Sequence, residues 1–319
     1  MNNCIHQYSS RVAQLIQDEL SKNSLLTPRT YHEHVLQGGQ KLRASITLCF
    51  IDTLKKKYPT KWNQHHQTWK NASLIVEYIH TASLIIDDLP HMDNETERRQ
   101  RPCLHHKYNT SIAHLVSYNL ILAAHTHLTN LFETFELPYN KYRTMYHELH
   151  HLFSNKLNLS HGLCAGQYLD LNFDKECVGL TQRQCKEKML DLIRQKTGSL
   201  FSLSFLLGWV VMTQDSKGMD EINSMGESFG ILYQILDDLR DYQDDKLQQK
   251  TKNTSTNIFD HFTIGEVIHL FNEHCKHCTT IINNKSLSKL SLLPALLHYI
   301  RKEFLNTLQN YNIVHTSVK

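Results

Sequence analysis

The sequence predicts an all-α protein, a single domain over residues 1–319 with roughly ten helices packed around a central cavity. Helix-interrupting residues are scarce, with 11 glycines and six prolines among 319 residues. Neither occurs in residues 103–137, 231–264 or 266–293. Segments of this length favour helices over short strands, and no linker rich in proline or serine suggests a second domain.

Apolar residues recur at helical spacing. In residues 72–88, Ile75, Ile79, Ala82 and Ile86 follow one another at three or four positions, as on one face of a helix. Strict alternation of apolar and polar residues over strand length is hard to find. The expected loops, which separate these helices, lie near 55–68, 94–103, 172–181, 213–220, 242–257 and 283–291.

Charge and composition argue against several classes of function. The net charge is only +3 and the basic residues are scattered, so we expect no binding to nucleic acid. The N-terminus lacks the apolar core of a signal peptide, and no stretch approaches the ~20 apolar residues that span a bilayer. Eight scattered cysteines suggest free thiols in a reducing compartment. We therefore expect a cytoplasmic protein without a transmembrane segment.

A first group of aspartates follows an apolar run. Asp87 and Asp88 come directly after SLII, and Asp93 lies five residues beyond Asp88. Pro90 disfavours helix at the residue before it. The helix should therefore end near Asp88, and Asp93 should return from the following turn.

A second group closes another apolar run, GILYQIL. Asp237, Asp238 and Asp241 form the pattern DDLRD. Positions i and i+4 lie on one face of a helix, so Asp237 and Asp241 should project together. We expect these carboxylates and those of the first group to face one another across a central cavity.

Clustered carboxylates repel one another unless a cation lies between them. Oxygen ligands suit Mg²⁺, which commonly binds one or two carboxylates together with substrate phosphates. A single such cluster could be an ordinary acidic helix end, but two clusters, each after an apolar helix, favour metal binding. The adjacent Arg98 and Arg99 could hold diphosphate oxygens in bidentate fashion. The expected metal ligands are Asp87, Asp88, Asp93, Asp237, Asp238 and Asp241.

Five stretches stand out in order along the chain: GGQKLRA at 38–44, EYIHTASLIIDDLPHMDNETERRQRP at 77–102, GQYLD at 166–170, KTGSLF at 196–201 and FGILYQILDDLRD at 229–241. Together they resemble the trans-isoprenyl diphosphate synthases, the family of farnesyl and geranylgeranyl diphosphate synthases. The resemblance implies the all-helical isoprenoid synthase fold, a homodimer, and three Mg²⁺ ions per active site. It also implies condensation of isopentenyl diphosphate with dimethylallyl, geranyl or farnesyl diphosphate.

The resemblance assigns residues to the substrates. For isopentenyl diphosphate they are Gln40, Lys41, Arg43, His80 and Arg99, where Gln40 replaces the lysine that the family carries. For the allylic diphosphate they are Arg98, Gln167, Asp170, Lys196, Thr197, Gln234 and Lys252. The catalytic set is Asp87, Asp88, Lys196, Thr197, Gln234 and Asp237. A second departure places Ser117 and Tyr118 where the family has Gly-Asp.

The chemistry implied is ionisation of the allylic diphosphate, followed by attack of the double bond of isopentenyl diphosphate. Cations would neutralise the charge that builds on the leaving diphosphate, and an apolar tunnel would protect the carbocation from water. Ser83 lies one turn before Asp87, and the resemblance makes Ala82 a floor of the tunnel. A small residue there is typical of synthases that make geranylgeranyl diphosphate.

Three alternatives remain open. A class I terpene cyclase shares the fold and one aspartate motif. An inactive subunit that regulates a partner synthase would be consistent with Gln40 and with the altered segment 113–122. A zinc-binding protein is suggested by His274, Cys275, His277 and Cys278, although no second cysteine pair accompanies them.

Overall fold

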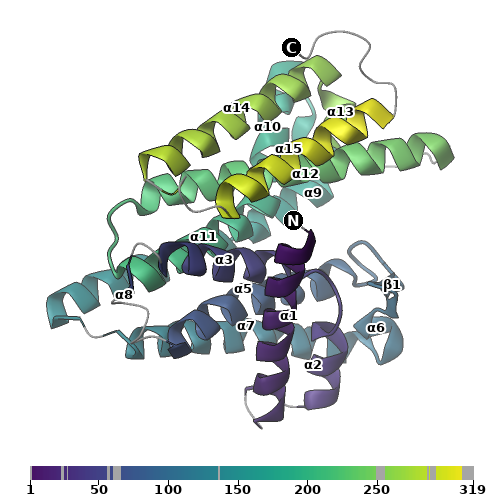
Figure 1. Cartoon of the computed structure of the whole chain (residues 1–319). Helices are drawn as coiled ribbons and strands as arrows, with labels where there is room; N and C mark the ends of the chain where they lie inside the picture. The colour runs from purple at the N-terminus through teal and green to yellow at the C-terminus, as the bar shows by residue number, and fades with distance from the viewer. Residues whose placement is uncertain are drawn as a thin grey trace. The chain divides into compact units, whose positions relative to one another are not determined.

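The computed structural model is helical almost throughout, which confirms the predicted all-α class (Figure 1). It describes residues 2–22, 25–26, 28–55, 58–59, 66–135, 137–248, 256–285, 287 and 292–310. The chain divides into two compact units. The first comprises Met1–His150 and Ser204–Ser216, and the second comprises His151–Leu203 and Lys217–Lys319. The single domain expected from the sequence stays a prediction.

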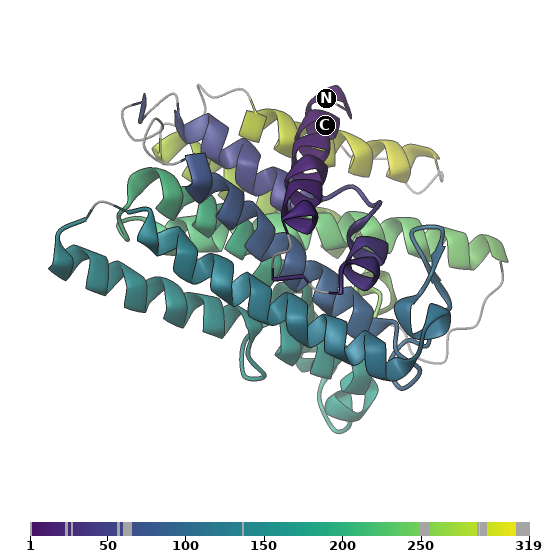
Figure 2. The same ribbon diagram turned by 90° about the horizontal axis from the view of Figure 1, so that it is seen from below.

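The first unit is built around α5, which runs along α7 and also packs against α3 and α1 (Figures 1 and 2). Residues 71–79 of α5 are buried without interruption, because neighbouring helices cover several of its sides. The helices of this unit are α1 (Asn2–Ser21), α2 (Arg29–Leu36), α3 (Leu42–Lys55), α5 (His66–Asp87), α6 (Leu104–Lys107), α7 (Thr110–Glu133), most of α8 (Tyr139–Leu157) and most of α11 (Ser199–Thr213).

A short hairpin follows α5, inside a segment predicted as a loop. Strand β1 (Glu97–Arg98) pairs antiparallel with β2 (Arg101–Pro102). The two residues between the strands, Arg99 and Gln100, have φ angles of 54° and 60°. Positive φ at both central residues is the feature of the tight turns that join twisted strands. This turn keeps Arg98 and Arg99 next to the end of α5.

The second unit consists of helices that cross at close range. They are α9 (Leu163–Cys177), α10 (Gln182–Ile193), the π-helical turn η1 (Arg194–Gly198), the start of α11, α12 (Met219–Gln248), α13 (Ile258–His261), α14 (Ile264–Asn284) and α15 (Leu292–Asn310). The loops expected at 172–181 and 242–257 begin later in the structure than the sequence predicted. Helix α9 continues to Cys177, where Phe173 anchors it in the core, and α12 continues to Gln248.

Glycines permit the close crossings around η1. A Cβ atom on Gly230 would lie 2.6 Å from Cα of Gly198, and one on Gly166 would overlap the backbone of Lys196. Contacts this short are available only to residues without a side chain. The turn that carries Lys196 is therefore held against both α9 and α12.

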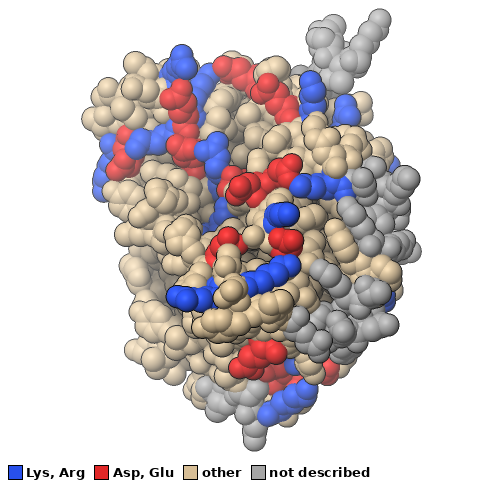
Figure 3. Space-filling model, turned by 90° about the vertical axis from the view of Figure 1, so that its left-hand side faces the viewer, with Lys and Arg blue, Asp and Glu red and all other residues tan. Residues whose placement is uncertain are grey.

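One continuous helical stretch, Gln182–Thr213, is long and apolar enough to cross a membrane by length and composition. Within the protein, 94% of its most apolar window is buried. Such burial is what a core helix of mainly apolar residues requires. On the surface view of Figure 3, Lys and Arg side chains are interspersed with Asp and Glu rather than gathered into a patch of one sign.

Candidate active site

The first aspartate cluster lies at the C-terminal end of α5. Asp87 is the last helical residue and Asp88 follows it, as Pro90 predicted. The backbone N–H of Asp93 donates to the carbonyl oxygen of Asp87 at 2.8 Å. The predicted return of Asp93 toward the helix end is therefore confirmed.

Asp88 is buried and already paired. Its Oδ1 lies 2.5 Å from Nε of Arg98, and the thiol of Cys103 also donates to its carboxylate. Burial and this carboxylate together raise the pKa of Cys103 to about 12. Arg98 lies in β1 and Cys103 directly follows β2, so their contacts with Asp88 fix the hairpin to the end of α5.

The glycine loop after α2 makes room for the second arginine. Gly38 and Gly39 have φ angles of 73° and 71°, a region that suits glycine. A Cβ atom on Gly39 would lie 2.5 Å from the guanidinium carbon of Arg99. Gln40 follows and is exposed. Gly39 therefore lets the guanidinium group of Arg99 approach the loop backbone.

Lys41 occupies a different environment from Gln40. Its ammonium lies 2.8 Å from Oε1 of Glu77, and the two side chains are only 2% and 0% exposed. Burial lowers the pKa of Lys41, partly offset by the charge of Glu77. In this geometry its ammonium neutralises a buried glutamate, and the assignment of Lys41 to isopentenyl diphosphate stays a prediction.

Arg43 and His80 lie together, as predicted. Nη1 of Arg43 is 3.2 Å from Nε2 of His80. Burial lowers the pKa of His80 well below its usual value, and the charges of Arg43, Arg99, Lys41 and Arg98 lower it further. The imidazole is therefore neutral and accepts a hydrogen bond from Arg43.

The two residues expected to limit chain length differ in exposure. Ala82 is fully buried, whereas Ser83 is half-buried and donates to the carbonyl oxygen of His80 at 2.9 Å. Ser117 of α7, one of the two departures from the family pattern, donates to the carbonyl oxygen of Ala82 at 3.2 Å. Tyr118 is exposed. Ser117 thus joins α7 to α5 at the position that the resemblance singles out.

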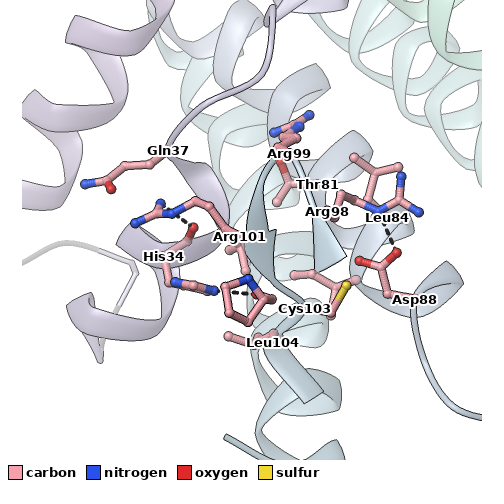
Figure 4. A pocket seen from close by; sticks show the side chains of 13 residues that line it. His34, Gln37, Thr81, Leu84, Asp88, Arg98, Arg99, Arg101, Cys103 and Leu104 are labelled. Atoms are coloured by element: carbon pink, nitrogen blue, oxygen red, sulfur yellow. Dashed lines mark hydrogen bonds and ion pairs between the residues drawn. The ribbon is translucent and has the colours of Figure 1, made fainter. Parts of the chain in front are cut away.

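A small cavity beside the hairpin contains residues that the sequence reasoning missed (Figure 4). Its volume is about 40 Å³, and Asp88, Arg98 and Arg99 line one part of it. Arg101 donates to the carbonyl oxygen of His34, and Nε2 of His34 lies 2.8 Å from the carbonyl oxygen of Pro102. The run RRQR could have drawn attention to Arg101. Nothing in the sequence distinguished His34.

In the second unit, the predicted Lys196 and Asp170 form an ion pair. Nζ of Lys196 lies 2.5 Å from Oδ2 of Asp170. Lys196 and Thr197 belong to the π-helical turn η1, and such turns occur frequently at functional sites. Gln167, one turn before Asp170, has a buried amide nitrogen without a hydrogen-bond partner among the described residues.

Thr197 begins a chain of hydrogen bonds. Its hydroxyl donates to Oε1 of Gln234 at 2.7 Å, and Nε2 of Gln234 donates to Oδ1 of Asp238 at 2.7 Å. Oδ2 of Asp238 accepts the backbone N–H of Ile258 at 3.0 Å. Burial raises the pKa of Asp238 to about 7, aided by the charges of Asp241 and Asp237 and opposed by these hydrogen bonds.

Both carboxylate oxygens of Asp238 already accept hydrogen bonds inside the protein, and its assignment to the metal ligands stays a prediction. Asp237 is half-buried, 3.6 Å from Nη1 of Arg240, and Asp241 is exposed. Asp237 and Asp241 therefore have the more accessible carboxylates of the second cluster. Lys252 lies outside the described residues.

The two aspartate clusters belong to different units, so their approach across a cavity stays a prediction. Within the described residues, no three His, Cys, Asp or Glu side chains lie close enough together to hold a metal. Hard oxygen donors in pairs nevertheless suit Mg²⁺, which completes its shell with water and phosphate.

The zinc alternative loses its basis in α14. Cys275 and Cys278 are buried, and the thiol of Cys278 donates to the carbonyl oxygen of Met225. His274 and His277 bond to serine hydroxyls of α12, at 3.0 and 2.8 Å. These residues pack α14 against α12.

A model of the polyprenyl synthetase family matches residues 26–289. The chain belongs to this family. Geranylgeranyl pyrophosphate synthase 4 of Arabidopsis thaliana is 30% identical over 222 residues, which are 68% of this chain and 54% of that protein. Farnesyl diphosphate synthase of Buchnera aphidicola is 30% identical over 253 residues, 77% of this chain and 82% of that protein.

Several solved structures share the fold. A geranyltranstransferase of Thermotoga maritima has a TM-score of 0.70 at 22% identity, covering 93% of this chain and 99% of that one. An FPP/GFPP synthase of Zymomonas mobilis has a TM-score of 0.72 at 21% identity, covering 94% and 100%. The match to the Arabidopsis relative spans only about half of that protein.

Proposed function

We propose that this member of the polyprenyl synthetase family is a prenyl diphosphate synthase that condenses isopentenyl diphosphate with allylic diphosphates. One observation supports it above the others. Nη1 of Arg43 lies 3.2 Å from Nε2 of the neutral His80, and the positive charge of Arg99 also acts on that imidazole. Such a concentration of positive charge favours an anionic ligand, and adjacent arginines suit phosphate oxygens.

Isopentenyl diphosphate would bind through Arg43 and Arg99. Gly39 lets Arg99 approach the loop, and His80 orients Arg43 through their hydrogen bond. The exposed Gln40 contributes an uncharged amide. Isopentenyl diphosphate would therefore be bound by two guanidinium groups, without the additional ammonium group that a lysine at position 40 would supply.

The allylic diphosphate would bind through Arg98 and Lys196. Asp88 and Asp170 hold these cations in place by ion pairs. Fixed cations can stabilise the negative charge that builds on a leaving diphosphate without first reorganising. Thr197 and Gln234 present a hydroxyl and an amide beside Lys196, and Lys252 would add a further cation.

The carboxylates of Asp87, Asp88 and Asp93 in the first cluster, and of Asp237 and Asp241 in the second, would hold Mg²⁺. Magnesium, when bound, would offset the charge of the diphosphate and so assist its departure. We infer three ions per active site from the family resemblance. A homodimer and a cytoplasmic location likewise remain predictions from the sequence.

Geranylgeranyl diphosphate is the proposed product. The small side chain of Ala82, five residues before Asp87, supports it, as does the similarity to a plant geranylgeranyl pyrophosphate synthase. The relative from Buchnera aphidicola is named for the shorter farnesyl product. The product is therefore to be measured directly.

The test is an assay of the purified full-length chain with Mg²⁺, isopentenyl diphosphate and each allylic primer in turn, followed by chromatography of the dephosphorylated products. We expect geranylgeraniol as the main alcohol. Products formed from an allylic diphosphate alone would instead support a terpene cyclase. A complete lack of products would support a regulatory subunit, and would refute the proposed function.

A further inference from the structure

Asp238 differs from the other carboxylates of the second cluster. It is 5% exposed, whereas Asp237 is half-buried and Asp241 is exposed. Oδ1 accepts from Nε2 of Gln234 at 2.7 Å, and Oδ2 accepts from the backbone N–H of Ile258 at 3.0 Å. Both oxygens therefore point into the protein.

On one side, Asp238 fixes the beginning of α13. Ile258 is the first residue of that helix, where backbone N–H groups have no intrahelical acceptor. The side-chain oxygen of the neighbouring Asn257 accepts the backbone N–H of Phe259 and so caps α13. Its side-chain nitrogen donates to the backbone carbonyl of Asp238 at 2.8 Å. Phe259 then stacks on Tyr242 of α12, with ring centroids 5.4 Å apart. The chain that follows residues 249–255 is thus attached to α12 at Asp238.

On the other side, Asp238 fixes the turn η1. Gln234 donates to Asp238 with its amide nitrogen, which leaves its oxygen facing Thr197. The hydroxyl of Thr197 donates to that oxygen at 2.7 Å. The carboxylate thereby selects one of the two orientations of the Gln234 amide, and through it the direction of the Thr197 hydroxyl.

We propose that Asp238 is a positioning residue that joins η1, α12 and α13, and that it does not bind metal. The inference rests on the proposed function, since Thr197 and Gln234 are assigned there to the allylic diphosphate. If Asp238 turned toward a cation, the buried N–H of Ile258 would lose its acceptor. It would also release the amide of Gln234.

The experiment compares Asp238→Asn and Asp238→Ala with Asp237→Asn, the neighbouring carboxylate that is half-buried. The asparagine oxygen can still accept from Ile258, and Gln234 can turn its amide to match. We expect Asp238→Asn to keep its turnover within about fivefold of wild type, the effect of one hydrogen bond. Asp238→Ala should lose about 10- to 100-fold, as outer partners of active sites commonly do.

Magnesium dependence separates positioning from ligation. We expect the Mg²⁺ concentration at half-maximal turnover to stay unchanged in Asp238→Asn and to rise in Asp237→Asn. Equal increases in both variants would overturn the proposal. A second measurement does not depend on turnover. It compares, between the variants, the rise in unfolding temperature that Mg²⁺ and inorganic diphosphate produce.

Hydrogen exchange tests the attachment itself. In the full chain without substrates, the peptide covering 256–262 should exchange faster in Asp238→Ala than in wild type, while Asp237→Asn should leave it unchanged. Unaltered exchange in Asp238→Ala would refute the attachment. If wild type fails to condense the substrates, the proposed function fails, but the thermal shift and the exchange still decide the role of Asp238.

Discussion

Sequence neighbours near the candidate site have opposite environments. Gln40 is exposed and Lys41 is buried against Glu77, and Asp237 is half-buried while Asp238 is enclosed. Successive residues on a helix point about 100° apart, so one of two adjacent carboxylates can face the core. At Lys41 the cause is a backbone with a φ of 50° directly before α3. A charge pattern alone therefore identifies a group of candidates, and the backbone selects among them.

The ammonium group of Lys41 is engaged in an ion pair with Glu77. A second ammonium group, at position 40, should therefore improve the binding of isopentenyl diphosphate. A charge-assisted hydrogen bond contributes about 1.5–3 kcal/mol, so Gln40→Lys should lower the KM for this substrate about tenfold or more. Steady-state kinetics with varied isopentenyl diphosphate measures this KM. Gln182→Lys, which adds the same charge to an exposed glutamine of α10, is the control and should leave that KM unchanged. If Gln40→Lys behaves like the control, position 40 does not contact the substrate.

Ala82→Tyr should shorten the main product from geranylgeranyl to farnesyl diphosphate. The side chain of Ala82 is fully buried and its carbonyl is bonded to Ser117, so the added ring should also cost about 1–3 kcal/mol of stability. Product chromatography and thermal unfolding measure the two effects. Ser83→Tyr places the same ring one position further round the helix. An unchanged product in Ala82→Tyr, with a shortened one in Ser83→Tyr, would move the tunnel floor to position 83.

Among the elements, the π-helical turn η1 depends on the absence of a side chain at Gly166. A Cβ atom there would overlap the backbone of Lys196, so Gly166→Ala must displace η1 or α9. We expect a loss of about 1–3 kcal/mol in stability and a marked fall in turnover, because Lys196 would move relative to Asp170. Denaturant unfolding and kinetics measure both. Gly265→Ala in α14 is the control, since its Cβ atom would meet nothing within 4 Å. Equal results for both variants would contradict the argument.

The sequence predicted the type of element well and its details less well. Apolar spacing and the scarcity of glycine and proline identified the long helices, and Pro90 located the end of α5. The hairpin at 97–102 was missed, because two-residue strands contain too few positions to show alternation. The turn η1 was also missed, and its close packing against Gly166 is a tertiary contact that no local sequence pattern shows. Tertiary contacts of Phe173 likewise carried α9 beyond its expected end.

For the whole molecule, the proposed chemistry requires two partial sites to act on one diphosphate. The first unit contributes Arg98 and the carboxylates of α5, and the second contributes Lys196 and Asp237. The aspartates of each cluster could be grouped from the sequence, because they follow one another at short spacing. Neither carries three metal-binding side chains within reach of one another among the described residues. The proposed mechanism is that substrate phosphates and both clusters complete the metal site together.

If the clusters share metal ions and a diphosphate, Asp87→Asn and Asp237→Asn should not act independently. Each alone should reduce turnover by orders of magnitude, through lost stabilisation of the leaving diphosphate. Residues that act as a unit show losses that are far from additive, so the double variant should be impaired less than the product of the two losses. We expect a coupling free energy of about 0.5–3 kcal/mol. Glu187→Gln, at an exposed glutamate of α10, combined with Asp87→Asn, is the control pair and should be additive. If the losses for Asp87→Asn and Asp237→Asn are additive too, the two clusters act independently. The shared-metal mechanism would then be wrong.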